Sequence, residues 1–319
     1  MRIVTADDLA RLLTYEGLIG ALAEAFRSEI AVPVRHHHTI PQADADATLL
    51  LMPAWTAEAA GTQGGERFIG CKIVTVFPGN AKAGRPSLYG QYLLLSGDTG
   101  EPLAMIDGRV LTAWRTACAS ALAASYLARE DASHLVMVGA GALAPHLVRA
   151  HASVRPIERV TLWNRTKAKA VALGFQLAEG GLTVDVTDRL EDVVREADIV
   201  SCATLSPTPL VRGAWLKKGA HVDLVGAFSL KTREADDAAI RRARVYVDSR
   251  ASAPKGSGDI AIPLRKKVLA LKGIQGDLFE LCRGKVKGRK RKDEITLFKS
   301  TGLALEDLAA ATLVWNGLK

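Results

Sequence analysis

A predicted strand, a glycine turn and a predicted helix follow one another near the middle of the chain. This pattern constrains the fold of the chain more than any other feature of the sequence. The apolar run Leu135–Val138 predicts a buried parallel strand that leads directly into Gly139 and Gly141. Gly139 would permit a tight turn, Gly141 would let a pyrophosphate approach the backbone, and small Ala144 would let the following helix pack closely. The helix N-terminus would face the anion with unpaired N–H groups. We predict a dinucleotide site here; a turn that only closes a strand–helix corner is the alternative.

The end of the next predicted strand, at 159–163, indicates which dinucleotide is bound. An acidic residue there would bind the ribose 2′-hydroxyl of NAD, whereas arginine accommodates the 2′-phosphate of NADP. The chain has Asn164, Arg165, Thr166 and Lys167 at this position, all of them hydrogen-bond donors. This predicts a preference for NADP(H), with NADH used more weakly. The alternative is a solvated start of the next helix, with Thr166 as its N-cap.

Strand and helix patterns alternate from about residue 131 onward, as in a parallel sheet with helical crossovers. Further strands are expected at 182–186, 198–204, 221–226 and, as the last one, 244–248. Helices are expected between them, including 190–197 and 234–242. The predicted fold class is α/β, with a Rossmann-type doubly wound parallel sheet in an NAD(P)-binding domain over residues 126–302.

The first part of the chain has another pattern and predicts a separate α+β substrate domain over residues 1–125. Two amphipathic helical segments, 5–13 and 15–29, precede short strand patterns separated by turns, which suits an antiparallel or mixed sheet. The alanine-rich segment 115–129 predicts a helix that bridges the two domains. A C-terminal helix within 303–319 is expected to return to the first domain.

The composition is that of an ordinary soluble globular protein, and it argues against membranes, metals and nucleic acids as partners. Of 319 residues, 48% are hydrophobic and 24% charged. We expect no secretory signal, and no apolar run is long enough to span a membrane. The spacing of the four cysteines and the consecutive histidines 36–38 suggest neither a disulfide framework nor a metal site, so a reducing cytoplasm is expected. The basic run 285–292 lacks aromatic residues, which favours a basic loop over nucleic-acid binding.

Cations in the first domain are the candidates for binding an anionic substrate. Lys72 lies inside an apolar strand pattern, so it either reaches toward solvent or points into a cleft with a counter-ion. Arg115 and Thr116 are expected to begin the alanine-rich helix, where a cation is unfavourable unless an anion binds there. Arg35 precedes the strand pattern at 49–52. Taken singly, each cation fits a surface or structural role better.

Short segments spread over nearly the whole chain resemble one known family in the same order. They are Leu51–Trp55, Gly70–Val74, Asp107–Thr112, Arg115–Ala117, the glycine turn, Ala197–Val200 and Phe298–Ser300. As a set they resemble the ornithine cyclodeaminase/mu-crystallin family. The resemblance implies that Arg35, Lys72 and Arg115 surround a substrate carboxylate. It also implies that Thr116 lies near the cofactor phosphates and that the N-terminal domain forms a homodimer interface.

One position separates the reactions of this family, which include cyclodeaminases, alanine dehydrogenases and imine reductases. In cyclodeaminases, an aspartate in the loop after the strand matching 221–226 assists attack by the ornithine side-chain amine. Here that position is Phe228, which cannot accept a proton and offers an apolar wall. Asp223, on the strand before it, is expected to be structural. The segment Gly226–Phe228 resembles that of bacterial delta-1-pyrroline-2-carboxylate/delta-1-piperideine-2-carboxylate reductases.

The resemblance therefore implies an NADPH-dependent reductase that converts these two cyclic imino acids to L-proline and L-pipecolate. Arg35, Lys72, Arg115 and Phe228 would contact the substrate. Lys72 could also supply a proton if neighbouring cations lower its pKa. Three alternatives stay open: an alanine or other open-chain amino-acid dehydrogenase, an ornithine cyclodeaminase, and a non-catalytic mu-crystallin-like binding protein.

The predicted cofactor contacts lie at the glycine turn, at the carboxyl ends of predicted strands and at the start of the alanine-rich helix. They are Thr116, Gly139, Gly141, Ala142, Leu143, Asn164, Arg165, Thr166, Lys167, Thr204 and Val225. No metal, nucleic acid or membrane is expected as a partner.

Overall fold

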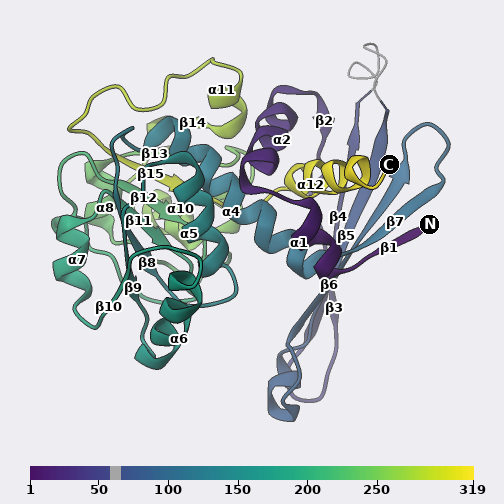
Figure 1. Ribbon diagram of the computed structural model, residues 1–319, viewed down its shortest axis with the longest axis horizontal. Coiled ribbons are helices and arrows are strands. Elements are labelled where there is room, and N and C mark those ends of the chain that lie inside the picture. Colours follow the sequence, from purple (N-terminus) through teal and green to yellow (C-terminus); the bar gives the residue numbers. More distant parts are fainter. Residues whose placement is uncertain (58–65) are drawn as a thin grey trace. The chain divides into compact units, whose positions relative to one another are not determined.

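A computed structural model describes residues 1–57 and 66–319, which form two compact units (Figure 1). Unit 1 comprises residues 1–115 and 303–319, and unit 2 comprises residues 116–302. The chain passes from unit 1 to unit 2 within helix α4 (Gly108–Leu127), whereas the domain boundary expected from sequence, 125/126, lies later in the same helix. Within the described residues, no helix is long and apolar enough to cross a bilayer.

Unit 2 is built on a parallel sheet of eight strands in the order β10-β9-β8-β11-β12-β15-β13-β14. The strands are β8 (His134–Val138), β9 (Arg159–Trp163), β10 (Val184–Thr187), β11 (Ile199–Cys202), β12 (His221–Leu224), β13 (Ala243–Val247), β14 (Ile274–Asp277) and β15 (Ile295–Lys299). The chain order reverses between β8 and β11, as in doubly wound nucleotide-binding sheets. The predicted Rossmann-type sheet is confirmed.

The expectation that 244–248 is the last strand was wrong. Two more strands follow, and β15 is inserted between β12 and β13, where all five of its residues are buried. Polar Thr296 and Lys299 interrupt its apolar pattern, which hides the strand in the sequence. Inside the sheet their polar groups have partners: Thr296 Oγ1 donates to the Leu127 carbonyl at 2.8 Å, and Lys299 Nζ lies 3.4 Å from Asp259.

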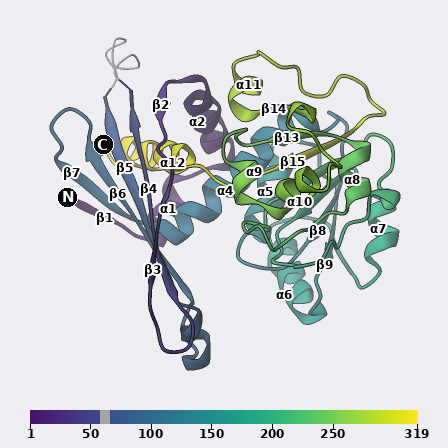
Figure 2. The same cartoon turned by 180° about the vertical axis from the view of Figure 1, so that it is seen from behind.

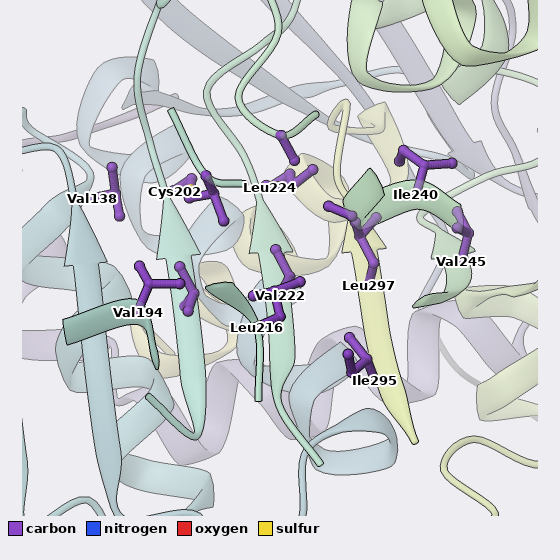
Figure 3. Packing of buried hydrophobic residues seen from close by; sticks show 14 of the residues in the cluster. Val138, Val194, Cys202, Leu216, Val222, Leu224, Ile240, Val245, Ile295 and Leu297 are labelled. Carbon is purple, nitrogen blue, oxygen red and sulfur yellow. The ribbon is translucent and has the colours of Figure 1, made fainter. Parts of the chain in front are cut away.

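Helices cover this sheet and complete its core. They are α5 (Ala144–Val154), α6 (Lys167–Ala178), α7 (Leu190–Glu196), α8 (Asp237–Arg242), α9 (Ala253–Gly256), α10 (Gly258–Arg265) and α11 (Leu278–Cys282), with short 3₁₀ segments η2 (Gly213–Trp215) and η3 (Leu271–Gly273). Val222, Leu297 and Val245 are cross-strand neighbours, and Val194 of α7 and Ile240 of α8 belong to the same buried cluster (Figure 3). This continuous apolar layer fixes the strands of unit 2 relative to one another.

The basic segment 285–292 is anchored to unit 2 by its backbone. Tyr246 donates its hydroxyl to the Lys287 and Gly288 carbonyls, and Arg289 Nε donates to the Leu127 carbonyl at 2.7 Å. Arg289 also donates to Thr296 Oγ1 at 3.1 Å. One of the cations in the run therefore has a structural role.

Unit 1 contains a mixed sheet of seven strands. They are β1 (Arg2–Val4), β2 (Ile30–Ala31), β3 (His36–Ile40), β4 (Ala47–Thr56), β5 (Phe68–Val76), β6 (Leu88–Ser96) and β7 (Pro102–Asp107). Only β1 and β7 pair in parallel among the described strands of this sheet, whose order is β1-β7-β6-β5-β4-β2 with β3 beside β4. Figure 2 shows the ends of β3 to β6 extending as a long ribbon tipped by η1 (Pro78–Ala83). The expected mixed sheet is confirmed.

Three further helices belong to unit 1: α1 (Ala6–Leu12), α2 (Tyr15–Arg27) and the C-terminal α12 (Ala304–Gly317). Helix α12 packs on α2 and on β4, β5 and β6 (Figure 1). Alternating residues of β5, among them Phe68, Lys72 and Val74, are buried, while Ile69 and Ile73 between them are exposed. Lys72 therefore points to the covered face of the sheet.

The expected start of the alanine-rich helix was wrong. Helix α4 begins at Gly108 because Asp107 Oδ1 accepts the backbone N–H groups of Arg109 and Val110, each at 2.9 Å. Arg115 and Thr116 consequently lie about two turns inside the helix and not at its N-terminus. The positive end of the helix dipole cannot be the reason for an anion near Arg115.

Candidate active site

The glycine turn of unit 2 has the geometry that a dinucleotide site needs. Gly139 has φ of 113°, and a Cβ there would lie 2.7 Å from the Ala203 carbonyl oxygen, so only glycine fits without strain. A Cβ at Gly141 would meet nothing within 4 Å. The turn therefore closes against the neighbouring strand at Gly139 and leaves open space at Gly141. Ala142 and Leu143 continue from this turn to α5, which begins at Ala144.

A pocket of about 300 Å³ opens beside this turn, at the carboxyl ends of β8, β9 and β11. Its lining includes six of the predicted cofactor residues: Gly139, Gly141, Asn164, Arg165, Thr166 and Thr204. The size is at the lower end of the range for small-molecule sites. Positive φ at the turn, open space beside it and donors at the strand tip together fit a dinucleotide.

The tip of β9 supplies the donors predicted for a 2′-phosphate. Arg165 and Thr166 are exposed and line the pocket, and Lys169, which sequence reasoning missed, lines it as well. Asn164 Nδ2 donates to the Thr166 carbonyl at 2.8 Å, so this amide shapes the loop. Lys167 Nζ lies 3.4 Å from Asp188 Oδ2, which compensates part of its charge.

Two further predicted cofactor residues, which do not line the pocket, lie in buried positions. Thr116 is buried within α4, and Val225 is buried after β12, where its N–H donates to the Cys202 carbonyl at 2.8 Å. Phe228, a predicted substrate contact, lies in the next loop and is 65% exposed, so its ring is accessible to a ligand. Asp223 accepts the hydroxyls of Ser120 and Ser201 at 2.9 and 2.7 Å and is fully buried, which gives it a structural role.

Unit 1 brings Lys72 and Arg115 together in a buried group of charges. Lys72 Nζ lies 2.9 and 2.8 Å from the two carboxylate oxygens of Asp307. Arg115 Nε donates to Asp307 at 2.9 Å and its Nη1 donates to Glu306 at 2.6 Å. Lys72 and Arg115 are 3% and 5% exposed, and both acids are fully buried. We call these four residues the charge cluster; its two positive and two negative side chains balance.

The surroundings of the charge cluster change the chemistry of Lys72. Burial, and then the positive charge of Arg115, lower the Lys72 pKa to about 8, although Asp307 and Glu306 oppose this change. Lys72 Nζ also donates to Thr112 Oγ1 at 3.3 Å. A lysine with this pKa can release a proton near neutral pH. This lowered pKa is the condition on which a proton-donating role of Lys72 depends.

Sequence reasoning missed the acidic half of the charge cluster. Glu306 and Asp307 lie on α12, in an otherwise apolar and alanine-rich segment. Two adjacent acids within such a segment are a usable signal, because Asp and Glu are rarely fully buried unless they are paired. Arg35, the third predicted cation, is half-buried between β2 and β3. Its role toward a substrate stays a prediction.

Comparison with known proteins shows the family of this chain. The model of the ornithine cyclodeaminase/mu-crystallin family matches residues 2–319. The chain belongs to this family. A delta(1)-pyrroline-2-carboxylate reductase from Colwellia psychrerythraea is 37% identical over 316 residues, which are 98% of this chain and 97% of the relative.

Solved structures also resemble the whole chain. The delta(1)-pyrroline-2-carboxylate reductase of Thermococcus litoralis, in complex with NADH and L-proline, has a TM-score of 0.91 at 31% identity, over 99% of this chain and 97% of that one. An archaeal alanine dehydrogenase dimer with bound NAD has a TM-score of 0.88 at 28% identity, over 99% and 95%. The predicted family, fold class and enzyme class, a nicotinamide-dependent oxidoreductase acting on C=N or CH–NH bonds, are confirmed.

Proposed function

We propose that the protein reduces cyclic imino acids with NADPH in preference to NADH. The substrates would be delta-1-pyrroline-2-carboxylate, giving L-proline, and delta-1-piperideine-2-carboxylate, giving L-pipecolate. The observation that carries the proposal is the charge cluster, in which a lysine and an arginine are held together in the substrate domain of a chain similar to such reductases. The predicted substrate domain comprises residues 1–125 with 303–319, and the predicted cofactor domain residues 126–302.

The charge cluster fits a substrate that carries one positive and one negative charge. Lys72 and Arg115 would bind its carboxylate, with Arg35 as the third cation. Because Glu306 and Asp307 already balance the two buried cations, a bare anion would leave a net negative charge in a buried site, which is costly. A protonated imine attached to the carboxylate restores the balance. The cluster therefore favours the zwitterion, which is also the form of the imine that accepts hydride.

Proton supply is the second role of this chain's own residues. A bound reduced nicotinamide supplies the hydride that adds to the imine carbon. The imine nitrogen must carry a proton when this happens, and an imine that enters the site unprotonated would receive it from Lys72, whose pKa is lowered to about 8. Lys72 would regain its proton from solvent after the product amino acid leaves. Phe228 would exclude water from the ring of the substrate.

Cofactor choice would depend on the tip of β9. Arg165, Thr166 and Lys167 would donate to the 2′-phosphate of NADPH, with Asn164 shaping the loop. Gly139, Gly141, Ala142 and Leu143 would hold the pyrophosphate with backbone N–H groups. The remaining predicted contacts are Thr116, Thr204 and Val225.

The test is oxidation of NADPH by the purified protein with each of the two cyclic imines. We expect rapid oxidation with both imines and slower oxidation with NADH. No oxidation, in a protein that binds NADPH, would refute the proposal. Pyruvate with ammonia or methylamine would then test an open-chain dehydrogenase, and ammonia release from ornithine would test a cyclodeaminase.

We also infer that the protein is a homodimer that associates through the outer face of the unit 1 sheet. On this face Trp55 and Ile69 are cross-strand neighbours, and with Ile73 each is more than a third exposed. Large apolar side chains exposed on one sheet face are typical of an interface. Light scattering should give twice the chain mass for the wild type and a lower mass for Ile73→Lys. A monomeric wild type would refute the inference.

A further inference from the structure

A buried carboxylate in unit 2 connects two loops at the edge of the sheet where the pocket opens. Glu234, between β12 and α8, is fully buried. Its Oε1 accepts the N–H of Thr204 at 2.6 Å and the hydroxyl of Thr204 at 2.9 Å. Its Oε2 accepts the N–H groups of Gly226 at 2.7 Å and Ala227 at 3.3 Å. One side chain thus binds the loop after β11 with one oxygen and the loop after β12 with the other.

The two loops are in direct backbone contact. A Cβ at Gly226 would lie 2.0 Å from the Thr204 carbonyl oxygen and 2.1 Å from the Thr204 nitrogen, so no side chain fits there. Strands β11 and β12 are neighbours in the sheet, and the loop after β11, from Ala203 to Pro207, lines the nucleotide pocket. Phe228 belongs to the loop after β12. The position of Glu234 therefore sets the wall of the pocket on this side.

The backbone at Glu234 is held in place by Asp259. Asp259 Oδ1 accepts the backbone N–H groups of Glu234 and Ala235 at 2.8 and 3.2 Å, and Asp259 Oδ2 lies 3.4 Å from Lys299 Nζ. Asp259 and Lys299 are fully buried. A buried chain of polar contacts thus runs from β15 through α10 to the two loops. Burying charged side chains costs free energy unless each charge has a partner. Stability alone therefore does not account for this arrangement.

We propose that Glu234 is a positioning residue for the cofactor, which holds the loops after β11 and β12 in the conformation that binds the dinucleotide. The inference rests on the proposed function only in assuming that the pocket binds a dinucleotide. Glu234 touches no reacting atom. It acts through Thr204 and through the backbone of Gly226 and Ala227.

The decisive variant is Glu234→Gln, which keeps the shape and removes the charge. Its amide N–H groups would face donors from Thr204 or Gly226, so one loop must move. We expect the Kd for NADPH, measured by fluorescence without substrate, to rise about tenfold or more, as for loss of a hydrogen bond to a buried charge. At saturating NADPH, kcat should change less than the KM for NADPH.

Asp198→Asn is the matched control. Asp198 lies at the amino end of β11, the strand whose carboxyl end leads to Thr204. Asp198 accepts the N–H groups of Ser133 and His134, each at 3.0 Å, and pairs with Arg129 and Lys217. It joins loops as Glu234 does, but at the opposite edge of the sheet. We expect this variant to lower Tm and to leave the Kd for NADPH unchanged. Equal Kd values for Glu234→Gln and wild type would overturn the proposal.

A pH profile separates positioning from stability. Burial and the negative charge of Asp259 raise the Glu234 pKa to about 7, while Lys299 and the Thr204 donors oppose this change. Cys202 of β11 also faces this carboxylate. Protonation removes an acceptor, so wild-type affinity for NADPH should fall relative to Glu234→Gln as the pH falls through 7. Parallel profiles would contradict the proposal.

A second variant serves if Glu234→Gln does not fold. Glu234→Asp keeps the charge but is one methylene shorter, so it cannot hold both loops at these distances, and the Kd for NADPH should rise about threefold. An unchanged Kd would overturn the proposal. If the wild type binds no dinucleotide, the proposed function itself fails. If wild type and variants bind equally well, only the role of Glu234 fails.

Discussion

The pocket of unit 2 and the charge cluster of unit 1 are built by opposite means. The pocket is bounded by main chain at Gly139 and by exposed donors such as Arg165, whose charge is screened by water. In the charge cluster, Lys72, Arg115 and Asp307 are buried and hold one another by ion pairs. Loss of one buried charge leaves another uncompensated. Single substitutions should therefore act strongly in the charge cluster and weakly at the exposed donors.

The largest expected effect is that of Lys72→Ala on catalysis. The substitution removes a cation of the proposed carboxylate site, which is also the proposed proton donor, and a general acid typically contributes about 100-fold or more. We expect kcat/KM for delta-1-pyrroline-2-carboxylate to fall by about that factor, with an unchanged Kd for NADPH. Lys82→Ala is the control, because Lys82 pairs with Asp44 at an exposed position in the same unit and should be replaceable. Near-normal kinetics of Lys72→Ala would remove it from the active site.

Asp307→Asn should show that the charge cluster depends on its balance. Breaking a buried ion pair by removing one partner costs about 3 kcal/mol, so urea unfolding should detect a loss of that size. Asp307 also raises the Lys72 pKa, which burial and Arg115 lower to about 8. Without Asp307 the Lys72 pKa should fall further, and the alkaline limb of the kcat/KM profile should move to lower pH. An alkaline limb at the wild-type position would argue against Lys72 as the proton donor.

Two glycine variants test the claim that main-chain geometry makes the pocket. Gly139→Ala should cost about 2 kcal/mol in the free energy of unfolding, because it combines positive φ with a Cβ 2.7 Å from the Ala203 oxygen. Gly141→Ala should leave this free energy within about 0.5 kcal/mol of wild type, since its Cβ meets open space. Both should weaken NADPH binding. Normal NADPH affinity of Gly141→Ala would mean that no phosphate approaches the backbone there.

The same contrast explains which features were readable from sequence. The glycine turn, the strand before it and the donors at 164–167 are local, so spacing in the sequence reports their arrangement. In the charge cluster, Lys72 and Asp307 are 235 positions apart and meet only because α12 packs on β5. Lys72 was identified from its apolar strand and from family resemblance, but its partners on α12 were not.

Two expectations were wrong: the start of α4 and the position of the last strand. In both cases the sequence pattern lacked a contact that the structure shows. Alanine content placed the start of α4 at Arg115, whereas the side chain of Asp107 satisfies the first N–H groups at Gly108 and extends the helix toward the N-terminus. Apolar periodicity missed β15 because Thr296 and Lys299 look solvent-facing in the sequence. Their buried partners, the Leu127 carbonyl and Asp259, lie far away in the chain.

The smallest expected effect is that of Arg165→Ala on cofactor choice. This variant tests the exposed donors of the pocket, which we contrast with the buried charge cluster. Arg165 is exposed at the tip of β9, where it lines the pocket with Thr166 and Lys169. An exposed ion pair contributes about 1 kcal/mol, so the ratio of kcat/KM with NADPH to that with NADH should fall about fivefold. Activity with NADH should stay unchanged, because NADH has no 2′-phosphate. Added salt should shrink the wild-type preference, since screening acts on exposed charges first. A ratio that neither the substitution nor salt alters would mean that the tip of β9 does not select the cofactor.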